Sequence, residues 1–257
     1  MLTSLQNPLI KDFCKLRQAK ERRRQNVCLL EGTNLIAAAI AQHFSFQTVL
    51  YTAVWAERYP ELIQRMKGDR REMVTPEILQ KAATTVSPDG VVASLSRELI
   101  SKEPPPSVQL GVAIERLQDP GNLGTIIRTA TATAVDGLFL SEDSVSPENP
   151  KVLRASVGAW FQTTPIVTPD LATLVRNYRT QGVQAIATLP NAEKTYWEID
   201  WQRPSLILLG NEGAGLSPEL AALADEAVSI PMAGGLESLN AAIACSLMLY
   251  EAYRQKY

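Results

Sequence analysis

The second half of the chain alternates short apolar runs with helical patterns, and this alternation restricts the possible folds more than any other feature. Strands that alternate with helices predict a mostly parallel sheet covered by helices on both faces. Ligands of such sheets bind beyond the carboxyl ends of the strands. The predicted strands are residues 110–114, 138–140, 164–167, 184–188, 205–209 and 227–230, with helices over 122–134 and 238–255 among those between and after them.

A proline-rich stretch divides the chain. Residues 101–107 contain three consecutive prolines and no other hydrophobic residue, which is typical of a stiff, extended linker. We expect an N-terminal domain of residues 1–100 and a larger domain of residues 108–257. Alternating helix and strand signals, beginning with a basic helix over residues 8–23, predict that the first domain is a small α/β domain.

The net charge of −2 conceals an asymmetry between the two domains. Residues 1–100 hold 14 Lys and Arg against 10 Asp and Glu, whereas residues 101–257 hold 11 against 17. A dense cationic run can bind RNA phosphates, although such a run alone is more often a solvated helix face. The predicted RNA-binding residues are Lys11, Lys15, Arg17, Lys20, Arg22, Arg23 and Arg24.

Several classes of function are disfavoured. His43 is the only histidine, and the three cysteines, Cys14, Cys28 and Cys245, are scattered without metal-ligand spacing. We therefore expect no metal site and no histidine base. Without a long apolar run or a signal-peptide pattern, a cytoplasmic protein with reduced thiols is expected.

Three unusual loops follow predicted strands. In residues 115–124, glycines precede a helix whose N-terminus suits an anion, and Arg128 lies further along that helix. Arg128 is an uncommon choice among apolar neighbours, although a structural ion pair would also explain it.

The second loop, residues 209–217, has three glycines in six positions around Glu212. Their order, G-x-x-G-x-G, is not the dinucleotide fingerprint G-x-G-x-x-G. Close approach of a ligand to the backbone explains such glycines, as does a tight strand-to-helix connection.

The third loop, residues 230–240, leads into the last helix. Ser238 is the expected N-cap of that helix. Asn240 then lies in an apolar helix start, where a buried amide would need partners and would pin a loop or a substrate.

Together the loops carry Asp-Pro-Gly-Asn-Leu-Gly-Thr-Ile-Ile-Arg from residue 119, Leu-Leu-Gly-Asn-Glu-Gly-Ala-Gly-Leu from residue 208, and Ile-Pro-Met followed by Glu-Ser-Leu-Asn from residue 230. In this order they resemble the motifs of the SpoU (TrmH) family of RNA 2′-O-methyltransferases, in the SPOUT superfamily. Residues 149–159 and parts of the N-terminal segment, including Leu30-Glu31-Gly32, are also similar to the family.

The resemblance implies an α/β parallel-sheet domain with a trefoil knot, preceded by a small ribosomal-protein-like RNA-binding domain. It implies a homodimer that transfers a methyl group from S-adenosyl-L-methionine to a ribose 2′-hydroxyl, with ribosomal RNA favoured as substrate. A transfer-RNA methyltransferase and a catalytically inactive RNA-binding protein remain alternatives, but the intact Arg128, Glu212 and Asn240 disfavour the latter.

The resemblance also assigns roles to residues. Arg128 would activate the hydroxyl, in its own subunit or the partner's; because an arginine pKa above about 12 makes it a poor base, it would act by lowering the pKa of the hydroxyl. The implied catalytic residues are Arg128, Asn122, Glu212, Ser238 and Asn240. The implied cofactor-binding residues are Leu209, Gly210, Asn211, Gly213, Ile230, Met232, Ser238 and Leu239.

Two positions depart from the family pattern. Ala241-Ala242 stands where the family often has Val-Ser, and Ala134 stands where it often has glycine. The first departure puts one possible polar contact in doubt.

Overall fold

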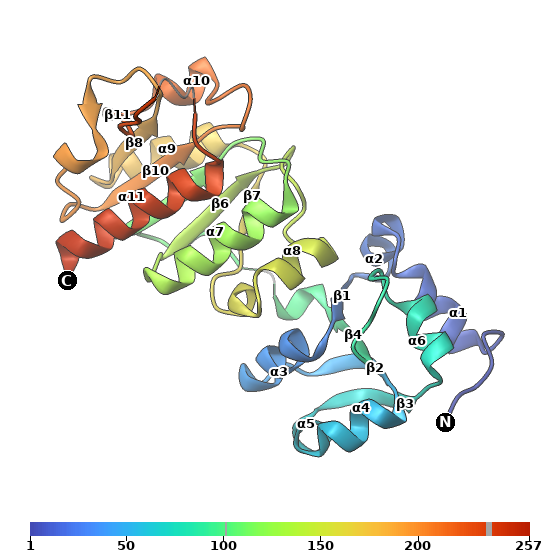
Figure 1. The fold of residues 1–257 in the computed structure, drawn as a ribbon. Coiled ribbons are helices and arrows are strands. Elements are labelled where there is room, and N and C mark those ends of the chain that lie inside the picture. Colours follow the sequence, from blue (N-terminus) through green and yellow to red (C-terminus); the bar gives the residue numbers. More distant parts are fainter. Residues whose placement is uncertain (101, 235–237) are drawn as a thin grey trace. The chain divides into compact units, whose positions relative to one another are not determined.

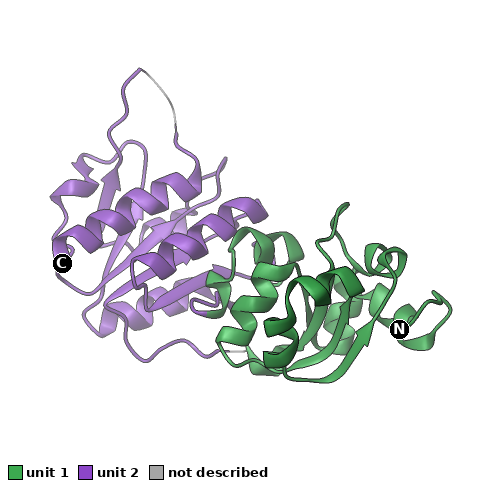
Figure 2. Cartoon of the chain, turned by 60° about the horizontal axis from the view of Figure 1, so that its bottom comes forward, with its two compact units in different colours: residues 1–101, 148–161 green, residues 102–147, 162–257 purple. Residues whose placement is uncertain are grey.

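The computed structural model describes residues 1–100, 102–234 and 238–257. The chain forms two compact units, of which the first comprises residues 1–101 and 148–161 and the second residues 102–147 and 162–257 (Figures 1 and 2). The division near residue 101 coincides with the start of the proline-rich stretch. Residues 148–161, which the sequence suggested as part of the second domain, pack instead with the first unit.

The second unit is built on a seven-stranded sheet in which every neighbouring pair is parallel. The central strands are buried on both faces, as expected for apolar runs in a parallel sheet that helices cover on both sides. In sheet order the strands are β7 (Ile166–Thr168), β6 (Gly137–Ser141), β5 (Leu110–Ile114), β10 (Ser205–Leu209), β8 (Gln184–Thr188), β11 (Glu226–Ser229) and β9 (Lys194–Thr195).

Helices cover both faces of this sheet, which confirms the predicted class. In Figure 1, α7 and α11 lie side by side across one face and α9 lies behind the sheet, where Leu174, Val175 and Tyr178 join a core with Phe139 and Leu208. The helices of this unit are α7 (Pro120–Ala132), α9 (Leu171–Thr180), α10 (Pro218–Ala221) and α11 (Ala241–Lys256), with the 3₁₀ turn η3 (Tyr196–Glu198).

The first unit has a four-stranded mixed sheet in the order β1-β4-β2-β3. Its strands are β1 (Val27–Glu31), β2 (Phe46–Tyr51), β3 (Gly68–Met73) and β4 (Val91–Ser96). Its helices are α1 (Pro8–Lys15), α2 (Ala19–Gln25), α3 (Thr33–Ala41), α4 (Ala53–Arg58), α5 (Pro60–Arg65), α6 (Pro76–Ala82) and α8 (Pro150–Ala155), with the 3₁₀ turns η1 (Arg97–Leu99) and η2 (Ala159–Phe161).

The prediction of one basic helix over residues 8–23 is wrong, because the structure has two helices there. The chain leaves α1 at Leu16, and α2 begins at Ala19. The guanidinium of Arg22 donates hydrogen bonds to the carbonyl oxygens of Leu16, at 2.8 Å, and Arg17, at 3.0 Å. These carbonyls have no partner within α1, so Arg22 satisfies the end of one helix from the next.

Residues 148–161 attach to the first unit through a buried ion pair. Arg154 of α8 donates to the carboxylate of Glu31 at 2.7 Å, and Glu31 also accepts from the backbone N–H of Thr84 at 2.8 Å. The Glu31 side chain is only 3% exposed. Phe161 stacks on Phe44 with ring centroids 5.1 Å apart, so this segment shares the core of the first unit.

Within the described ranges, no helix is long and apolar enough to cross a lipid bilayer.

Candidate functional site

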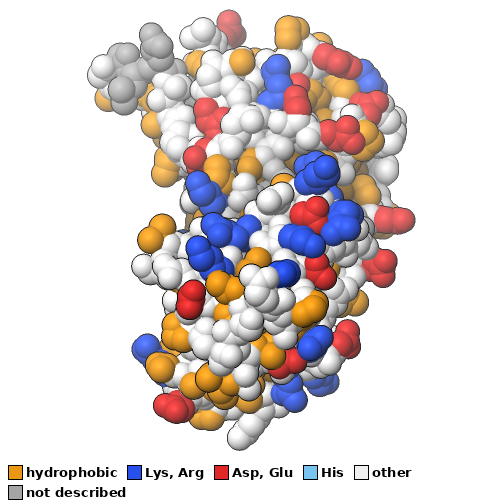
Figure 3. Space-filling model, turned by 90° about the vertical axis from the view of Figure 1, so that its right-hand side faces the viewer, with side chains coloured by type: hydrophobic (Ala, Val, Ile, Leu, Met, Phe, Trp, Pro, Cys, Tyr) orange, Lys and Arg blue, Asp and Glu red, His pale blue; other side chains and the backbone are white. Residues whose placement is uncertain are grey.

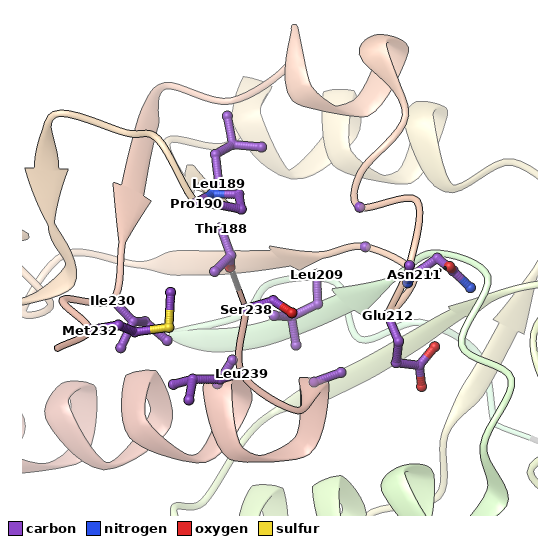
Figure 4. A pocket seen from close by; sticks show the side chains of 15 residues that line it. Thr188, Leu189, Pro190, Leu209, Asn211, Glu212, Ile230, Met232, Ser238 and Leu239 are labelled. Carbon is purple, nitrogen blue, oxygen red and sulfur yellow. Dashed lines mark hydrogen bonds between the residues drawn. The ribbon is translucent and has the colours of Figure 1, made fainter. Parts of the chain in front are cut away.

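A pocket of about 280 Å³ lies beyond the carboxyl ends of the adjacent strands β10, β8 and β11, where ligands of parallel sheets bind (Figure 4). Its volume is near the lower end of the range of about 300–1,000 Å³ for small-molecule sites. Among the described residues its lining is Thr188, Leu189, Pro190, Leu209, Gly210, Asn211, Glu212, Gly213, Gly215, Ile230, Met232, Ser238, Leu239, Ala241 and Ala244.

All eight residues predicted to bind the cofactor line this pocket. In Figure 4, Ile230 and Met232 face Ser238 from one side, while Asn211 and Glu212 lie on the other. The sequence prediction missed the segment Thr188–Leu189–Pro190, which follows β8. Nothing in the local sequence indicated it, because only the strand order places β8 between β10 and β11.

The glycine loop after β10 folds back on itself. Asn211 and Gly215 exchange two backbone hydrogen bonds, and a Cβ atom on Gly210 would lie 2.0 Å from the carbonyl carbon of Gly215. Gly215 has φ +69°, a conformation that side chains disfavour. These two glycines are therefore required by the turn itself.

The loop after β5 is fastened to the glycine loop. The Asn211 side chain accepts from the N–H groups of Gly213 and Ala214 and donates to the carbonyl of Arg116 at 2.8 Å. The Glu115 carboxylate accepts from the N–H of Ser217 at 2.7 Å. Every polar atom of the Asn211 side chain thus bonds within the protein, so Asn211 shapes the pocket wall through these contacts.

A second connection joins all three predicted loops. Asn122, in the first turn of α7, donates to Glu212 Oε1 at 3.0 Å and accepts from Asn240 Nδ2 at 2.9 Å. Residues far apart in the sequence therefore form one chain of side-chain hydrogen bonds. Three of the five predicted catalytic residues, Asn122, Glu212 and Asn240, lie in this chain, and a fourth, Ser238, lies in the pocket wall.

The structure corrects the expected start of the last helix. Asn240, not Ser238, is the N-cap of α11, with Oδ1 accepting from the N–H groups of Ala242 and Ile243. Asn240 is exposed, not buried within the helix. Its amide therefore orders the helix start, and Ser238 faces the pocket. Residues 235–237 of this loop, which include Glu237 of the Glu-Ser-Leu-Asn motif, lie outside the described residues.

Arg128 stands apart from the other predicted catalytic residues. It lies on the exposed side of α7 and is not among the described pocket-lining residues. Its guanidinium forms no ion pair within the described ranges. Arg128 is therefore available to a ligand.

The predicted RNA-binding cations differ in their surroundings. Lys11, Lys15, Arg17, Lys20, Arg23 and Arg24 are exposed. Arg22 is only 9% exposed, and its guanidinium bonds to the backbone at the end of α1. The prediction that Arg22 binds RNA is therefore corrected. Figure 3 shows Lys and Arg side chains gathered on one face, with Asp and Glu among them.

The cysteines do not provide a nucleophile. Burial raises the pKa of the Cys14 and Cys28 thiols and raises that of Cys245 to about 12, which keeps them protonated near neutral pH. Within the described residues, no group of three His, Cys, Asp or Glu side chains is arranged to hold a metal ion.

A parallel α/β sheet with a pocket at the carboxyl ends of three adjacent strands is typical of an α/β protein that binds a small molecule. Residues 109–250 match the model of the SpoU rRNA methylase family, and residues 7–93 match that of the MRM3-like substrate binding domain. The chain belongs to the SpoU rRNA methylase family, and it is a methyltransferase that uses S-adenosyl-L-methionine.

Relatives match the chain over its whole length. An uncharacterized tRNA/rRNA methyltransferase of Synechocystis sp. is 47% identical, over 100% of this chain and 94% of the relative. The 23S rRNA (guanosine(2553)-2′-O)-methyltransferase of Bacillus subtilis is 29% identical, over 97% of each. The crystal structure of an AdoMet-bound rRNA methyltransferase from Sinorhizobium meliloti superposes with a TM-score of 0.85 at 33% identity, covering 98% of this chain and 97% of that one.

Proposed function

We propose that this protein transfers a methyl group from S-adenosyl-L-methionine to a ribose 2′-hydroxyl of ribosomal RNA. One observation carries the proposal: the hydrogen-bond chain Glu212–Asn122–Asn240 borders a pocket lined by all eight predicted donor-binding residues. The ribosomal RNA substrate is supported by the Bacillus subtilis relative, which is a 23S rRNA 2′-O-methyltransferase.

The lining suits the methyl donor. Leu209, Ile230, Met232 and Leu239 provide apolar surface for an adenine ring. Glu212 is the only charged side chain among the described lining residues, and a carboxylate favours a cationic ligand. When bound, S-adenosyl-L-methionine supplies a methyl group activated by a sulfonium. The residues of the pocket bind and orient this donor.

Arg128 is the proposed catalytic cation. Because arginine is a poor base, its guanidinium acts by stabilising the alkoxide that develops as the hydroxyl proton passes to solvent water, and by holding the adjacent phosphate. Asn122, Glu212, Ser238 and Asn240 position the ribose against the donor, and alignment of the reacting oxygen is a major part of the rate enhancement. Arg128 acts either in its own subunit or across a dimer.

The proposal includes a homodimer. Helix α11 exposes Ile243, Leu247 and Tyr250, followed by Tyr253 and Tyr257. The first three are four and three residues apart, so they form one stripe along the helix. A contiguous exposed apolar stripe is typical of a protein interface, and a second copy of the chain is the proposed occupant.

Three further features complete the proposal. The six exposed cations of α1, α2 and the turn between them bind RNA phosphates. The second unit is knotted, an inference supported by the way the segments after β10 and β11 line the same pocket. The protein acts in the cytoplasm, where ribosomal RNA is assembled and thiols stay reduced, in keeping with its three free cysteines.

The test is transfer of labelled methyl from S-adenosyl-L-methionine to unmodified 23S ribosomal RNA and, in parallel, to transfer RNA, followed by digestion to nucleosides. We expect a 2′-O-methyl nucleoside from ribosomal RNA. Label on transfer RNA alone would favour the transfer-RNA alternative, and label on a base would contradict ribose methylation. Absence of both transfer and donor binding would favour an RNA-binding protein without catalysis.

A further inference from the structure

Arg116 follows Glu115, which is the first residue after β5. Its backbone is left-handed, with φ +55°. Its N–H donates to Ser141 Oγ at 2.8 Å, and its carbonyl accepts from Asn211 Nδ2 at 2.8 Å and from Gln118 Nε2 at 3.1 Å. These bonds explain why the backbone turns here. They do not explain an arginine, because glycine avoids a cost of roughly 1–2 kcal/mol in this conformation.

The Arg116 side chain gains little inside the protein. Its Nε is buried without a hydrogen-bond partner in the part of the chain that the structure describes. Its one ion-pair contact, from Nη2 to Glu115 Oε2, is long at 3.5 Å, and the side chain is 38% exposed. A buried unpaired donor costs about 1–3 kcal/mol, so this side chain is a poor choice for stability.

Arg116 lies on the edge of the sheet that carries the pocket. β5 is the neighbour of β10, so Arg116 is about one strand spacing, roughly 4.8 Å, from the start of the glycine loop. Its bonding partner Asn211 lines the pocket. The backbone of Arg116 therefore lies beside the donor site, joined to Ser141 of β6 through its N–H and to the pocket-lining Asn211 through its carbonyl.

Acidic residues accompany Arg116 in the loops after β5 and β6. Glu115 accepts from Ser217 N–H, and Asp143, in the loop after β6, accepts from Ser141 Oγ. Glu142 is exposed in the same loop. These carboxylates would repel an RNA backbone, and Arg116 is the cation placed among them.

We propose that Arg116 binds a backbone phosphate of the RNA beside the target ribose. This inference rests on the proposed RNA methylation at the pocket. Guanidinium groups bind phosphate through two parallel hydrogen bonds, and the bound phosphate gives the exposed end of Arg116 the partners it lacks in the folded chain. The strained backbone and the unpaired Nε are a cost in stability that RNA binding offsets.

The experiment compares Arg116→Gly with the wild type in thermal unfolding, S-adenosyl-L-methionine binding and binding of 23S ribosomal RNA transcript at several salt concentrations. Arg116→Gly should keep or raise Tm and leave donor binding unchanged. It should weaken RNA binding about three- to tenfold and reduce the salt slope by about 0.7, the loss of one phosphate contact. Arg116→Lys, which keeps the charge, should retain most of the slope.

Two control variants separate the effect of relieving backbone strain from the effect of removing an arginine charge. Ala134 also has positive φ, at +53°, so Ala134→Gly relieves a similar strain in the same unit and should raise Tm without changing RNA binding. Arg203 is exposed and precedes β10, so it lies at the amino ends of the strands, opposite the pocket. Arg203→Gly should therefore leave RNA binding unchanged.

Wild-type RNA affinity and salt slope in Arg116→Gly would overturn the inference. A fall in Tm and donor binding together with RNA binding would also overturn it, because Arg116 would then be structural. A wild type that neither binds nor methylates the RNA would contradict the proposed function itself, whereas an active wild type matched by Arg116→Gly contradicts only the role of Arg116.

Discussion

The side-chain amide of Asn122 donates to Glu212 Oε1 over 3.0 Å, and its oxygen accepts from Asn240. A carboxylate only accepts hydrogen bonds, so Glu212 fixes which way the Asn122 amide faces, and Asn122 in turn fixes Asn240. The N-cap role of Asn240 then ties the start of α11 to the same chain.

Asn122→Asp should break this chain, because the new carboxylate at position 122 would face the carboxylate of Glu212 and could not donate to it. We expect a fall in kcat of about 100-fold, the scale of a displacement of about 1 Å at a reacting centre. Methyl transfer and donor binding are measured together. Adding Glu212→Gln restores a donor–acceptor pair and should recover activity if positioning is the role of Glu212. Donor binding that stays weak in the double variant would show that the Glu212 charge is needed for the cationic donor.

Arg128→Ala should lower turnover strongly while leaving folding and donor binding intact, since Arg128 is exposed and outside the described pocket lining. The expected loss in kcat is about 100- to 1,000-fold, as for removal of one donor to a developing oxyanion. Arg176→Ala, which removes an exposed arginine from α9, is the control. Unchanged turnover in Arg128→Ala would remove this residue from the mechanism.

Arg22 and Arg23 are neighbours with different expected roles. Arg22→Ala leaves the carbonyls of Leu16 and Arg17 without their donor and should lower stability by about 1–3 kcal/mol. Arg23→Ala should leave Tm unchanged and weaken RNA binding, with a smaller salt slope. Thermal unfolding and RNA filter binding distinguish them; equal effects on both readouts would contradict the assignment.

The sequence predicted the central strands of the second unit well because β5, β8 and β10 are mostly apolar and buried on both faces. It missed β9, which is short and polar. β8 and β10 have the predicted bounds. β3 was missed because its sequence, Gly-Asp-Arg-Arg-Glu-Met, is charged. It is an edge strand, where charged side chains discourage pairing with other chains.

Long-range contacts account for the other differences. No local pattern shows that Arg22 turns back to α1, or that residues 148–161 pack on the first unit through Arg154 and Glu31. The motifs indicated which loops form the site, but the segment after β8 joins it only through the strand order. Ala134 shows why glycine is common at its position: the chain there has positive φ at the end of α7.

Glu31→Ala should destabilise the protein strongly. It leaves the Thr84 N–H without its buried acceptor and removes the carboxylate that pairs with Arg154, whose side chain is 29% exposed and keeps its bond to Thr84 Oγ1, so we expect a loss of about 2–3 kcal/mol. Urea unfolding measures the loss. Glu21→Ala, which breaks the exposed pair with Arg24, should cost at most about 1 kcal/mol. Similar losses for both variants would contradict the structural role of the Glu31 pair.

Asp225 makes stability depend on acid pH. Its side-chain hydrogen bonds with Arg179 and the bond from the Ala185 N–H lower the pKa of its carboxyl below the ordinary value of 3.8. A lowered pKa means that the contribution of Asp225 to stability is complete above pH 3.8 and is lost as the pH falls further, through the pKa of Asp225 in the folded protein.

Because the pair of Asp225 with Arg179 is partly exposed, Asp225→Asn should cost only about 1 kcal/mol near neutral pH. In urea unfolding, the difference between wild type and variant should stay constant from about pH 7 to pH 5 and shrink only below about pH 4. A difference that shrank already between pH 7 and about pH 5 would mean that the pKa of Asp225 in the folded protein lies above its ordinary value, and that Arg179 does not stabilise its charged form.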